Sequence, residues 1–361
     1  MLLVALAVPA AGVGSAAAKG EGALAIVAWH GLLENEWVKP FEKQTGCKVQ
    51  AAYAGSSNEL VDQLRTGKFD VGGVSADVGR ALIDAKTVAP IDLKRVPAVR
   101  GFLPAFRAPA STTAGGVTYG VALHWAPNVL LYNTKQVKPR PVSWRSIYSA
   151  GFKGKIVVPN DPMQIADAAL YLKTAQPKLA IRDPFELTKQ QFNAAVVLLQ
   201  HQKPLVTSYW DYPADEVQSF RDGHAVIGPA WPWQTATLKA AKVPVAQTTP
   251  REGMTGWIDS WMLAKKAKHR TCAYEWFQYT STPAVQAQIA TSYGAAPVSA
   301  AGCAAMEREK QGSCSRLYGQ VTAASLGSVR FWKTPLVACG TGSRSCVGYA
   351  DWQRAWVRIQ G

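Results

Sequence analysis

Short apolar runs alternate with segments of helical character along most of this chain, and no other feature restricts its fold so strongly. Ala23–Trp29 and Cys47–Tyr53 are typical of buried strands. The segment between them, Leu33–Thr45, has apolar residues at helical spacing and is followed by Gly46, a common helix terminator. Alternation of this kind predicts an α/β lobe built on a mostly parallel sheet.

The alternation changes after residue 116 and then resumes. Thr188 followed by Gln191 predicts a capping box at the start of a helix, and Trp257–Leu263 is a long apolar run typical of a buried strand. At 361 residues the chain is about twice the length of one domain, so we expect two lobes. The expected ranges are 19–124 with 256–302 for the first lobe, and 125–255 with 303–361 for the second.

Residues 1–18 have the composition of an export signal. Leu2–Val13 is apolar and rich in alanine, and the small residues up to Ala18 resemble a cleavage site. This run is too short to span a membrane. The alternative is a buried first helix, which Pro9 and two glycines disfavour. We therefore predict a cleaved signal peptide and a soluble periplasmic protein.

Six cysteines suit an oxidising compartment. Two pairs of neighbours enclose short loops that close easily, and the third pair follows by elimination. The predicted disulfides are Cys303–Cys314, Cys339–Cys346 and Cys47–Cys272. The alternative is that some of the six are free and buried, because spacing alone does not prove pairing.

The net charge of +15 raises the question of a nucleic-acid partner. Lysines and arginines are scattered along the chain, and no nucleic-acid-binding motif accompanies them. We therefore expect a solvated basic surface and no nucleic-acid partner.

Motifs of catalysis and metal binding are missing from the sequence. It contains no nucleophile elbow, phosphate-binding loop or dinucleotide fingerprint, and no cysteine or histidine spacing of a zinc site. The five histidines are widely separated and are expected to be structural. We predict no enzyme activity, no cofactor and no metal site.

Tryptophans lie at predicted strand ends, where a ligand-binding cleft is expected. The chain has thirteen tryptophans, and four of them lie beside turn residues at predicted strand ends: Trp29, Trp125, Trp231 and Trp257. Asp161 and Asp259 lie at similar positions. Ligand clefts of α/β sheets form at strand ends, and an indole face binds alkyl chains or cations, the latter for ~0.5–2 kcal/mol.

Several segments in a fixed order carry a family likeness. Among them are Val38–Val49, Leu131–Thr134, Phe152–Lys155 and, most specific, Trp257–Ser260, which reads Trp-x-Asp-Ser. Together they resemble the spermidine/putrescine-binding proteins of bacterial ABC importers. The resemblance implies a two-lobed α/β fold, the type II periplasmic binding protein, in which each lobe is a mixed sheet flanked by helices and the ligand cleft lies at the hinge.

The resemblance also implies roles for individual residues. Trp29, Trp231 and Trp257 match aromatic positions that sandwich the methylenes of a polyamine. Asp161 and Asp259 match the carboxylates that pair with its ammonium groups. Ser75 matches a polar contact and Tyr293 an aromatic one. With Asp77 and the strand-end Trp125, the expected ligand-binding set is Trp29, Ser75, Asp77, Trp125, Asp161, Trp231, Trp257, Asp259 and Tyr293.

Four positions depart from the pattern of the family. Leu32 stands where an aromatic residue is usual, and Gln164 where a second acid is usual. Lys333 replaces an amide and would repel an amine if it pointed inward. Asp77 stands where the family has an aromatic residue, and its negative charge would compensate for the positive charge of Lys333. These departures leave the identity of the amine open.

We therefore predict the substrate-binding component of an ABC importer. It would act as a monomer, capture a small cationic solute and deliver it to a membrane permease. The first alternative is a type II binding protein for another solute, namely thiamine, a ferric complex, a phosphonate, an amino acid or a sugar. The second is an exported enzyme on the same scaffold.

Overall fold

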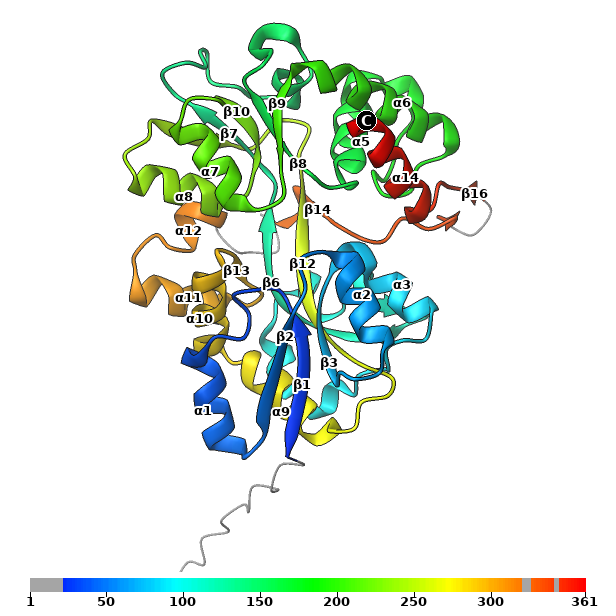
Figure 1. Cartoon of the computed structure of the whole chain (residues 1–361), viewed down its shortest axis with the longest axis vertical. Coiled ribbons are helices and arrows are strands. Elements are labelled where there is room, and N and C mark those ends of the chain that lie inside the picture. Colours follow the sequence, from blue (N-terminus) through cyan, green and yellow to red (C-terminus); the bar gives the residue numbers. More distant parts are fainter. Residues whose placement is uncertain (1–21, 320–325, 341–343) are drawn as a thin grey trace, which may run out of the picture.

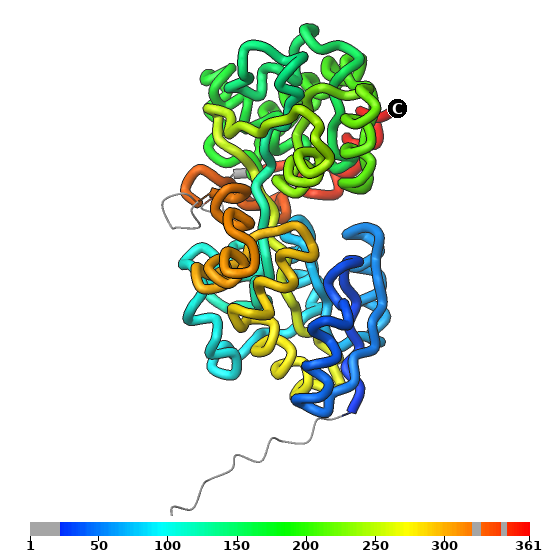
Figure 2. The backbone as a smooth tube through the Cα atoms, turned by 90° about the vertical axis from the view of Figure 1, so that its left-hand side faces the viewer, coloured from blue at the N-terminus to red at the C-terminus, as the bar shows by residue number. Residues whose placement is uncertain are grey.

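The computed structural model describes residues 22–319, 326–340 and 344–361. The predicted export signal, residues 1–18, lies outside this range. Within it, no helix is long and apolar enough to cross a membrane. Figures 1 and 2 show two lobes stacked along the long axis of the molecule, with each lobe built around its own sheet.

A seven-stranded sheet forms the core of the lower lobe in Figure 1, in the order β13-β6-β12-β3-β1-β2, with β14 paired to β12. β1 is parallel to β2 and β3, whereas β12 is antiparallel to β3 and β6. The expectation of a mostly parallel sheet was therefore wrong for this lobe, because the long strand β12 enters it from the other direction. The strands are β1 Ala23–Ala28, β2 Lys48–Tyr53, β3 Val71–Ser75, β6 Gly120–Pro127, β12 Met254–Leu263, β13 Ala296–Pro297 and β14 Val329–Phe331.

A five-stranded mixed sheet forms the core of the upper lobe, in the order β11-β7-β10-β8-β9. β8 is parallel to β9 and β10, and β7 is antiparallel to β10 and β11. Its strands are β7 Val129–Asn133, β8 Ile156–Pro159, β9 Val206–Trp210, β10 Ile227–Ala230 and β11 Val245–Thr248. Two short hairpins lie outside both sheets, β4 Thr113–Ala114 with β5 Val117–Thr118 and β15 Ala338–Cys339 with β16 Arg344–Ser345.

Helices flank both sheets (Figure 1). Those of the lower lobe are α1 Asn35–Thr45, α2 Ser57–Arg65, α3 Ala76–Asp84, α4 Pro104–Arg107, α9 Arg270–Thr280, α10 Pro283–Tyr293 and α11 Ala300–Glu309. Those of the upper lobe are α5 Gln164–Ala175, α6 Lys189–Gln202, α7 Pro213–Arg221, α8 Pro232–Ala240, α12 Ser315–Tyr318 and α14 Tyr349–Gln360.

Local signals in the sequence set several helix ends. The capping box at the start of α6 is confirmed: the Thr188 hydroxyl accepts a hydrogen bond from the Gln191 N–H, and the Gln191 side chain accepts one from the Thr188 N–H. Gly46 follows α1 with a φ of 79°, a left-handed conformation that glycine adopts without a steric penalty.

The chain crosses between the lobes at short connections. It passes from β6 to β7 through Asn128, and from β11 back to β12 between Thr248 and Met254. The expected boundary at residue 303 falls inside α11, which packs against α10 of the lower lobe, whereas α12 packs against α8 of the upper lobe. We therefore propose that this crossing follows α11.

All six cysteines form disulfides, in the three predicted pairs. The alternative of free buried cysteines is therefore wrong. Cys47–Cys272 joins the start of β2 to α9 across a separation of 225 residues, whereas Cys303–Cys314 spans only 11.

The long-range disulfide is expected to stabilise the fold most. Replacing both Cys47 and Cys272 by serine should lower the free energy of unfolding by about 2–5 kcal/mol, because a long loop of the unfolded chain is released. Urea denaturation followed by circular dichroism measures this change. The matched control, serine at Cys303 and Cys314, should cost less; an equal or larger loss in the control would contradict the loop-entropy explanation.

Candidate functional site

The candidate site begins where strands of the lower sheet end. Trp29 follows β1, and Ser75 ends β3 directly opposite Asp259 of β12. Trp257 and Asp259 are two residues apart on β12, so their side chains lie on the same face of the sheet. Strand ends of this kind are where α/β folds bind ligands.

Asp259 is buried and is held by a histidine. Nε2 of His124, on the neighbouring strand β6, lies 2.9 Å from Oδ2 of Asp259. The His124 ring stacks on Tyr293 with centroids 4.5 Å apart and meets the edge of Trp257 at 5.4 Å. Nδ1 of His124 has no hydrogen-bond partner among the described residues. His124 had no place in the candidate site expected from the sequence, whereas in the structure its ring orients Asp259.

Aromatic rings continue from this point into the upper lobe. Trp257 meets Trp231, just before α8, with ring centroids 5.3 Å apart, and Trp231 meets Trp210 at 5.2 Å. The indole N–H of Trp231 donates to Oδ1 of Asn128 at 3.1 Å. Three of the expected aromatic residues, Trp231, Trp257 and Tyr293, are therefore in one connected cluster that spans both lobes.

Asp77 forms a second carboxylate position beside the first. It lies in the first turn of α3 and is 2% exposed. Oδ1 accepts a hydrogen bond from the Ser57 hydroxyl at 3.2 Å, and Oδ2 accepts one from the Tyr349 hydroxyl at 2.8 Å. Burial raises the pKa of Asp77, and the charge of Asp259 adds to the rise, although both hydroxyl donors oppose it.

Asp161 supplies a third carboxylate, from the upper lobe. It follows β8, and its Oδ1 accepts a hydrogen bond from the Met163 N–H at 2.7 Å. Burial raises the pKa of Asp161 to about 8, and the charges of Asp77 and Asp167 contribute to the rise. Asp77 and Asp161 are thus within each other's electrostatic reach although they belong to different lobes.

A polar network supports the lobe crossing behind these carboxylates. Gln164, one of the departures from the family pattern, donates to Oδ2 of Asp167 at 2.9 Å. The Thr255 hydroxyl donates to the other oxygen of Asp167 and accepts from Asn128 at 2.7 Å. Burial raises the pKa of Asp167 to about 6 against these hydrogen bonds. Gln164 therefore orients Asp167, an acid on the same helix, α5.

Trp125 does not lie with the other expected site residues. Its neighbour His124 faces Asp259, and since adjacent residues of a strand point to opposite faces, Trp125 points into the core behind β6. It packs against Phe106 and Phe331, and its N–H donates to the Pro297 carbonyl at 3.1 Å. We therefore leave Trp125 out of the candidate site. Trp29 is half-buried and packs against the hydrophobic core of the lower lobe.

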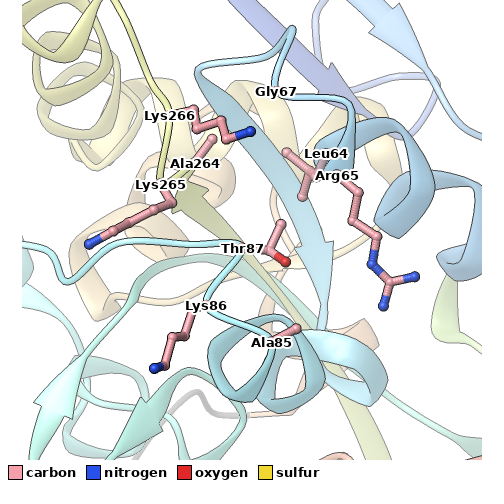
Figure 3. A pocket seen from close by; sticks show the side chains of 9 residues that line it. All are labelled: Leu64, Arg65, Gly67, Ala85, Lys86, Thr87, Ala264, Lys265 and Lys266. Atoms are coloured by element: carbon pink, nitrogen blue, oxygen red, sulfur yellow. The ribbon is translucent and has the colours of Figure 1, made fainter.

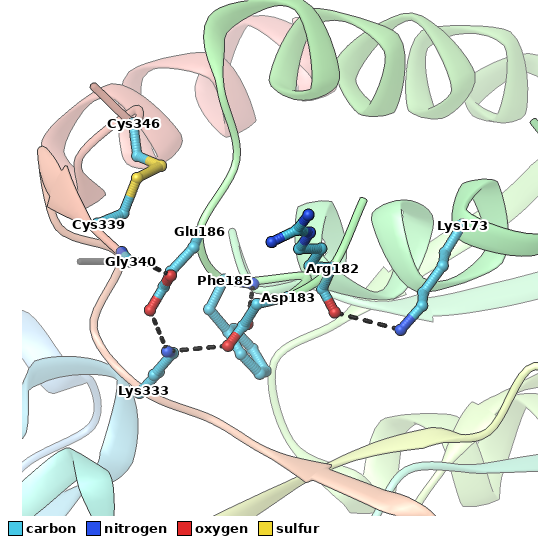
Figure 4. A network of polar contacts seen from close by, with 9 residues as sticks. All are labelled: Lys173, Arg182, Asp183, Phe185, Glu186, Lys333, Cys339, Gly340 and Cys346. Carbon is cyan, nitrogen blue, oxygen red and sulfur yellow. Dashed lines mark hydrogen bonds and ion pairs between the residues drawn. A yellow bond between two sulfur atoms is a disulfide. The ribbon is translucent and has the colours of Figure 1, made fainter. Parts of the chain in front are cut away.

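Lys333 has its charge satisfied outside the carboxylate cluster. Its Nζ lies 2.9 Å from Asp183 and 2.5 Å from Glu186, and the other oxygen of Glu186 accepts from the Gly340 N–H at 3.0 Å. Figure 4 shows these contacts beside the Cys339–Cys346 disulfide. Lys333 also lines a hollow of about 350 Å³ with Arg80 of α3. Lys333 would repel an amine only if it pointed into the site, and here its charge is paired with two carboxylates.

A basic hollow of about 180 Å³ lies at the other end of the lower sheet, where β12 ends. In Figure 3 the charged heads of Arg65, Lys86 and Lys265 point away from it. Arg65 stands in the last turn of α2, where a positive charge complements the helix dipole. We assign this hollow no ligand.

Comparison with known proteins identifies relatives of this chain. The sequence model of a family described as bacterial extracellular solute-binding protein matches residues 36–307. The spermidine/putrescine-binding periplasmic protein of Escherichia coli (strain K12) is 22% identical over 303 residues, covering 81% of this chain and 82% of that protein. The putrescine-binding periplasmic protein PotF of the same organism is 25% identical over 302 residues, covering 80% of each.

The fold is shared with solved structures. A putative spermidine/putrescine ABC transporter protein from Listeria monocytogenes superposes with a TM-score of 0.76 at 16% identity, covering 94% of this chain and 98% of that one. The two-lobed α/β architecture expected from the sequence is thereby confirmed.

The raised pKa values predict how stability depends on pH in the absence of ligand. An aspartate whose pKa is about 8 in the folded protein and about 3.8 when unfolded keeps its proton only in the folded state between these values. The free energy of unfolding should therefore fall as pH rises from about 4 to 8, by about 1.4 kcal/mol per pH unit for each such proton. Urea denaturation at several pH values measures this slope.

Asp161→Asn should flatten the slope, because its side-chain oxygen still accepts from Met163 but no longer ionises. The matched control is Asp62→Asn, at an exposed aspartate of α2 paired only with Arg65. If Asp161→Asn and Asp62→Asn have the same pH dependence, the proposed ionisation of Asp161 is wrong.

Proposed function

Because this chain belongs to the bacterial extracellular solute-binding proteins, we propose that it captures a small cationic solute of the polyamine type for an ABC importer. One observation carries the proposal: Asp77 lies within reach of the charges of Asp259 in its own lobe and Asp161 in the other lobe, and Asp259 lies beside a cluster of aromatic rings. The relatives named for spermidine and putrescine support the choice of solute.

The carboxylates provide the attraction for ammonium groups. Asp77 and Asp161 have no ion-pair partner among the described residues, and Asp259 meets only His124. Burial raises the pKa values of Asp77 and Asp161, and neighbouring negative charge adds to the rise. An ammonium group placed among them would form charge-assisted hydrogen bonds where little water competes.

The aromatic cluster suits the apolar part of such a solute. Trp257, Trp231 and Tyr293 present ring faces and edges on which methylene groups would be buried. A cation held over an indole face gains ~0.5–2 kcal/mol, more when it is desolvated. Alternating charge and apolar surface is the chemical pattern of an alkyl amine with terminal ammonium groups.

Closure of the lobes would be coupled to capture. Asp259 and Asp77 belong to the lower lobe and Asp161 to the upper lobe, so bringing the lobes together without a cation costs free energy, either as repulsion between ionised carboxylates or as uptake of a proton. A bound ammonium group would attract carboxylates of both lobes and would therefore favour the closed form. We propose that the closed monomer then docks on a membrane permease outside the cytoplasm and performs no catalysis itself.

Amine binding is the direct test. Putrescine and spermidine should raise the melting temperature of the protein, because a ligand that binds only the folded state stabilises it by mass action. Thermal denaturation identifies the ligand and isothermal titration calorimetry gives its affinity. Thiamine, a ferric complex, a phosphonate, amino acids and sugars form the comparison set, and a shift with one of these and none with amines would overturn the choice of solute.

Asp259→Asn should weaken amine binding about 30-fold or more, since losing one partner of a buried charge pair costs about 2 kcal/mol or more. The substituted side chain keeps an acceptor for His124, so circular dichroism should show an intact fold. Asp62→Asn is the control and should bind like the original protein. Unchanged affinity in Asp259→Asn would remove this carboxylate from the proposed site.

A further inference from the structure

The C-terminal segment that follows β14 lies beyond residues 36–307, the part matched by the family model. From β14 it passes Lys333 and the Cys339–Cys346 disulfide and ends in α14. Figure 1 shows α14 in red at the lower side of the upper lobe, above α2 and α3 of the lower lobe. This helix therefore faces both lobes.

The start of α14 is fixed firmly to the upper lobe. The Val347 N–H donates to the Leu187 carbonyl at 2.9 Å, and the Tyr349 N–H donates to the Pro335 carbonyl at 3.0 Å. Trp352 is fully buried, and its ring packs against Phe192 of α6 at 6.1 Å. Because its backbone and core contacts are fixed, the first turn of α14 holds Tyr349 in a defined place.

Side chains of α14 reach the elements that carry two of the three carboxylates. The Tyr349 hydroxyl donates to Oδ2 of Asp77 at 2.8 Å. The Trp356 N–H donates to Oδ1 of Asn160 at 2.9 Å, immediately before Asp161. A third contact joins Gln353 to Asn58 near the start of α2 at 2.9 Å. The helix thus touches Asp77 directly and the Asp161 loop through its neighbour.

The groups around Asp77 come from four elements. Ser57 of α2 and Tyr349 of α14 each donate a hydroxyl, one to each carboxylate oxygen. Asp259 of β12 and Asp161 after β8 bring negative charge. Each oxygen of an ionised carboxylate accepts more than one hydrogen bond, so an ammonium group would still find free lone pairs on Asp77.

We infer that Tyr349 is a positioning residue of the ligand site: its hydroxyl orients Asp77 and favours the ionised form, which accepts an ammonium group of the solute. The inference rests on the proposed function for the identity of the solute, but not for the Tyr349–Asp77 contact itself. Neutral Asp77 would be a poor acceptor for an ammonium group, and the two hydroxyl donors counteract the burial that favours this neutral form.

The test compares Tyr349→Phe with the original protein. This change removes one hydroxyl and keeps the ring, so Asp77 should become harder to ionise. Carbon-13 NMR titration of aspartate carboxyl groups in the ligand-free protein measures this, with the Asp77 signal assigned from Asp77→Asn. The midpoint of Asp77 should move to higher pH. The matched control is Tyr279→Phe, whose hydroxyl donates to the Trp37 carbonyl and not to a carboxylate.

Calorimetry with putrescine from pH 6 to 9 gives the second readout. Tyr349→Phe should bind at least about 5-fold more weakly near pH 7, and the loss should shrink as pH rises, because a higher pH restores the ionised form of Asp77. A loss equal at every pH would indicate damaged packing and would overturn the positioning role.

The two measurements separate the two proposals. If the original protein binds no amine, the proposed function fails, and the NMR titration still decides whether Tyr349 controls Asp77. An unmoved Asp77 midpoint in Tyr349→Phe overturns the inference even if amines bind.

Discussion

Desolvated carboxylates repel one another, and this molecule holds Asp77, Asp161 and Asp259 where its two lobes meet. Two of them have raised pKa values, caused first by burial and then by neighbouring charge. Neighbouring groups reduce the free-energy cost of burying these carboxylates. Hydroxyl groups donate to Asp77, a backbone N–H donates to Asp161, and an imidazole bonds to Asp259. Each carboxylate is oriented by its own element, so the geometry of the site depends on how the lobes are placed.

That placement depends on two strands at the centre of the lower sheet. β6 and β12 are paired antiparallel, and each continues into or out of the upper lobe. Asn128 and Thr255 lie at these crossings and bond to one another and to the acid of α5, Asp167. The same pair of strands carries Asp259, Trp257 and His124, so the crossing that joins the lobes also positions the central site residues.

The sequence predicted the architecture because the signals involved are local or periodic. The capping box at Thr188 and the spacings of Cys303–Cys314 and Cys339–Cys346 each need only a short window of residues, and they were confirmed. The strand–helix alternation predicted the α/β fold correctly, but not the antiparallel strands of the lower sheet. Adding the family resemblance selected Trp231, Trp257, Asp259 and Tyr293, which the structure brings together.

The rest of the candidate site could not be predicted, because it depends on strand register and on contacts between residues far apart in the sequence. Trp125 and His124 are adjacent, and only the register of β6 against β12 decides which one faces Asp259. Lys333 could be judged only with its partners Asp183 and Glu186, about 150 residues earlier. Tyr349 gave no signal at all, because its role arises from a helix that packs onto a distant part of the chain.

The bond between Tyr349 and Asp77 joins residues 272 positions apart, and this has a consequence for folding. Contacts of such high sequence separation form late, since most of the chain must be ordered before the two ends of the loop meet. Asp77 and Asp259 already need β3 to pair with the distant strand β12, and Tyr349 adds a contact that needs the last helix as well. Under the proposed function, solute affinity would therefore report on completion of the whole molecule.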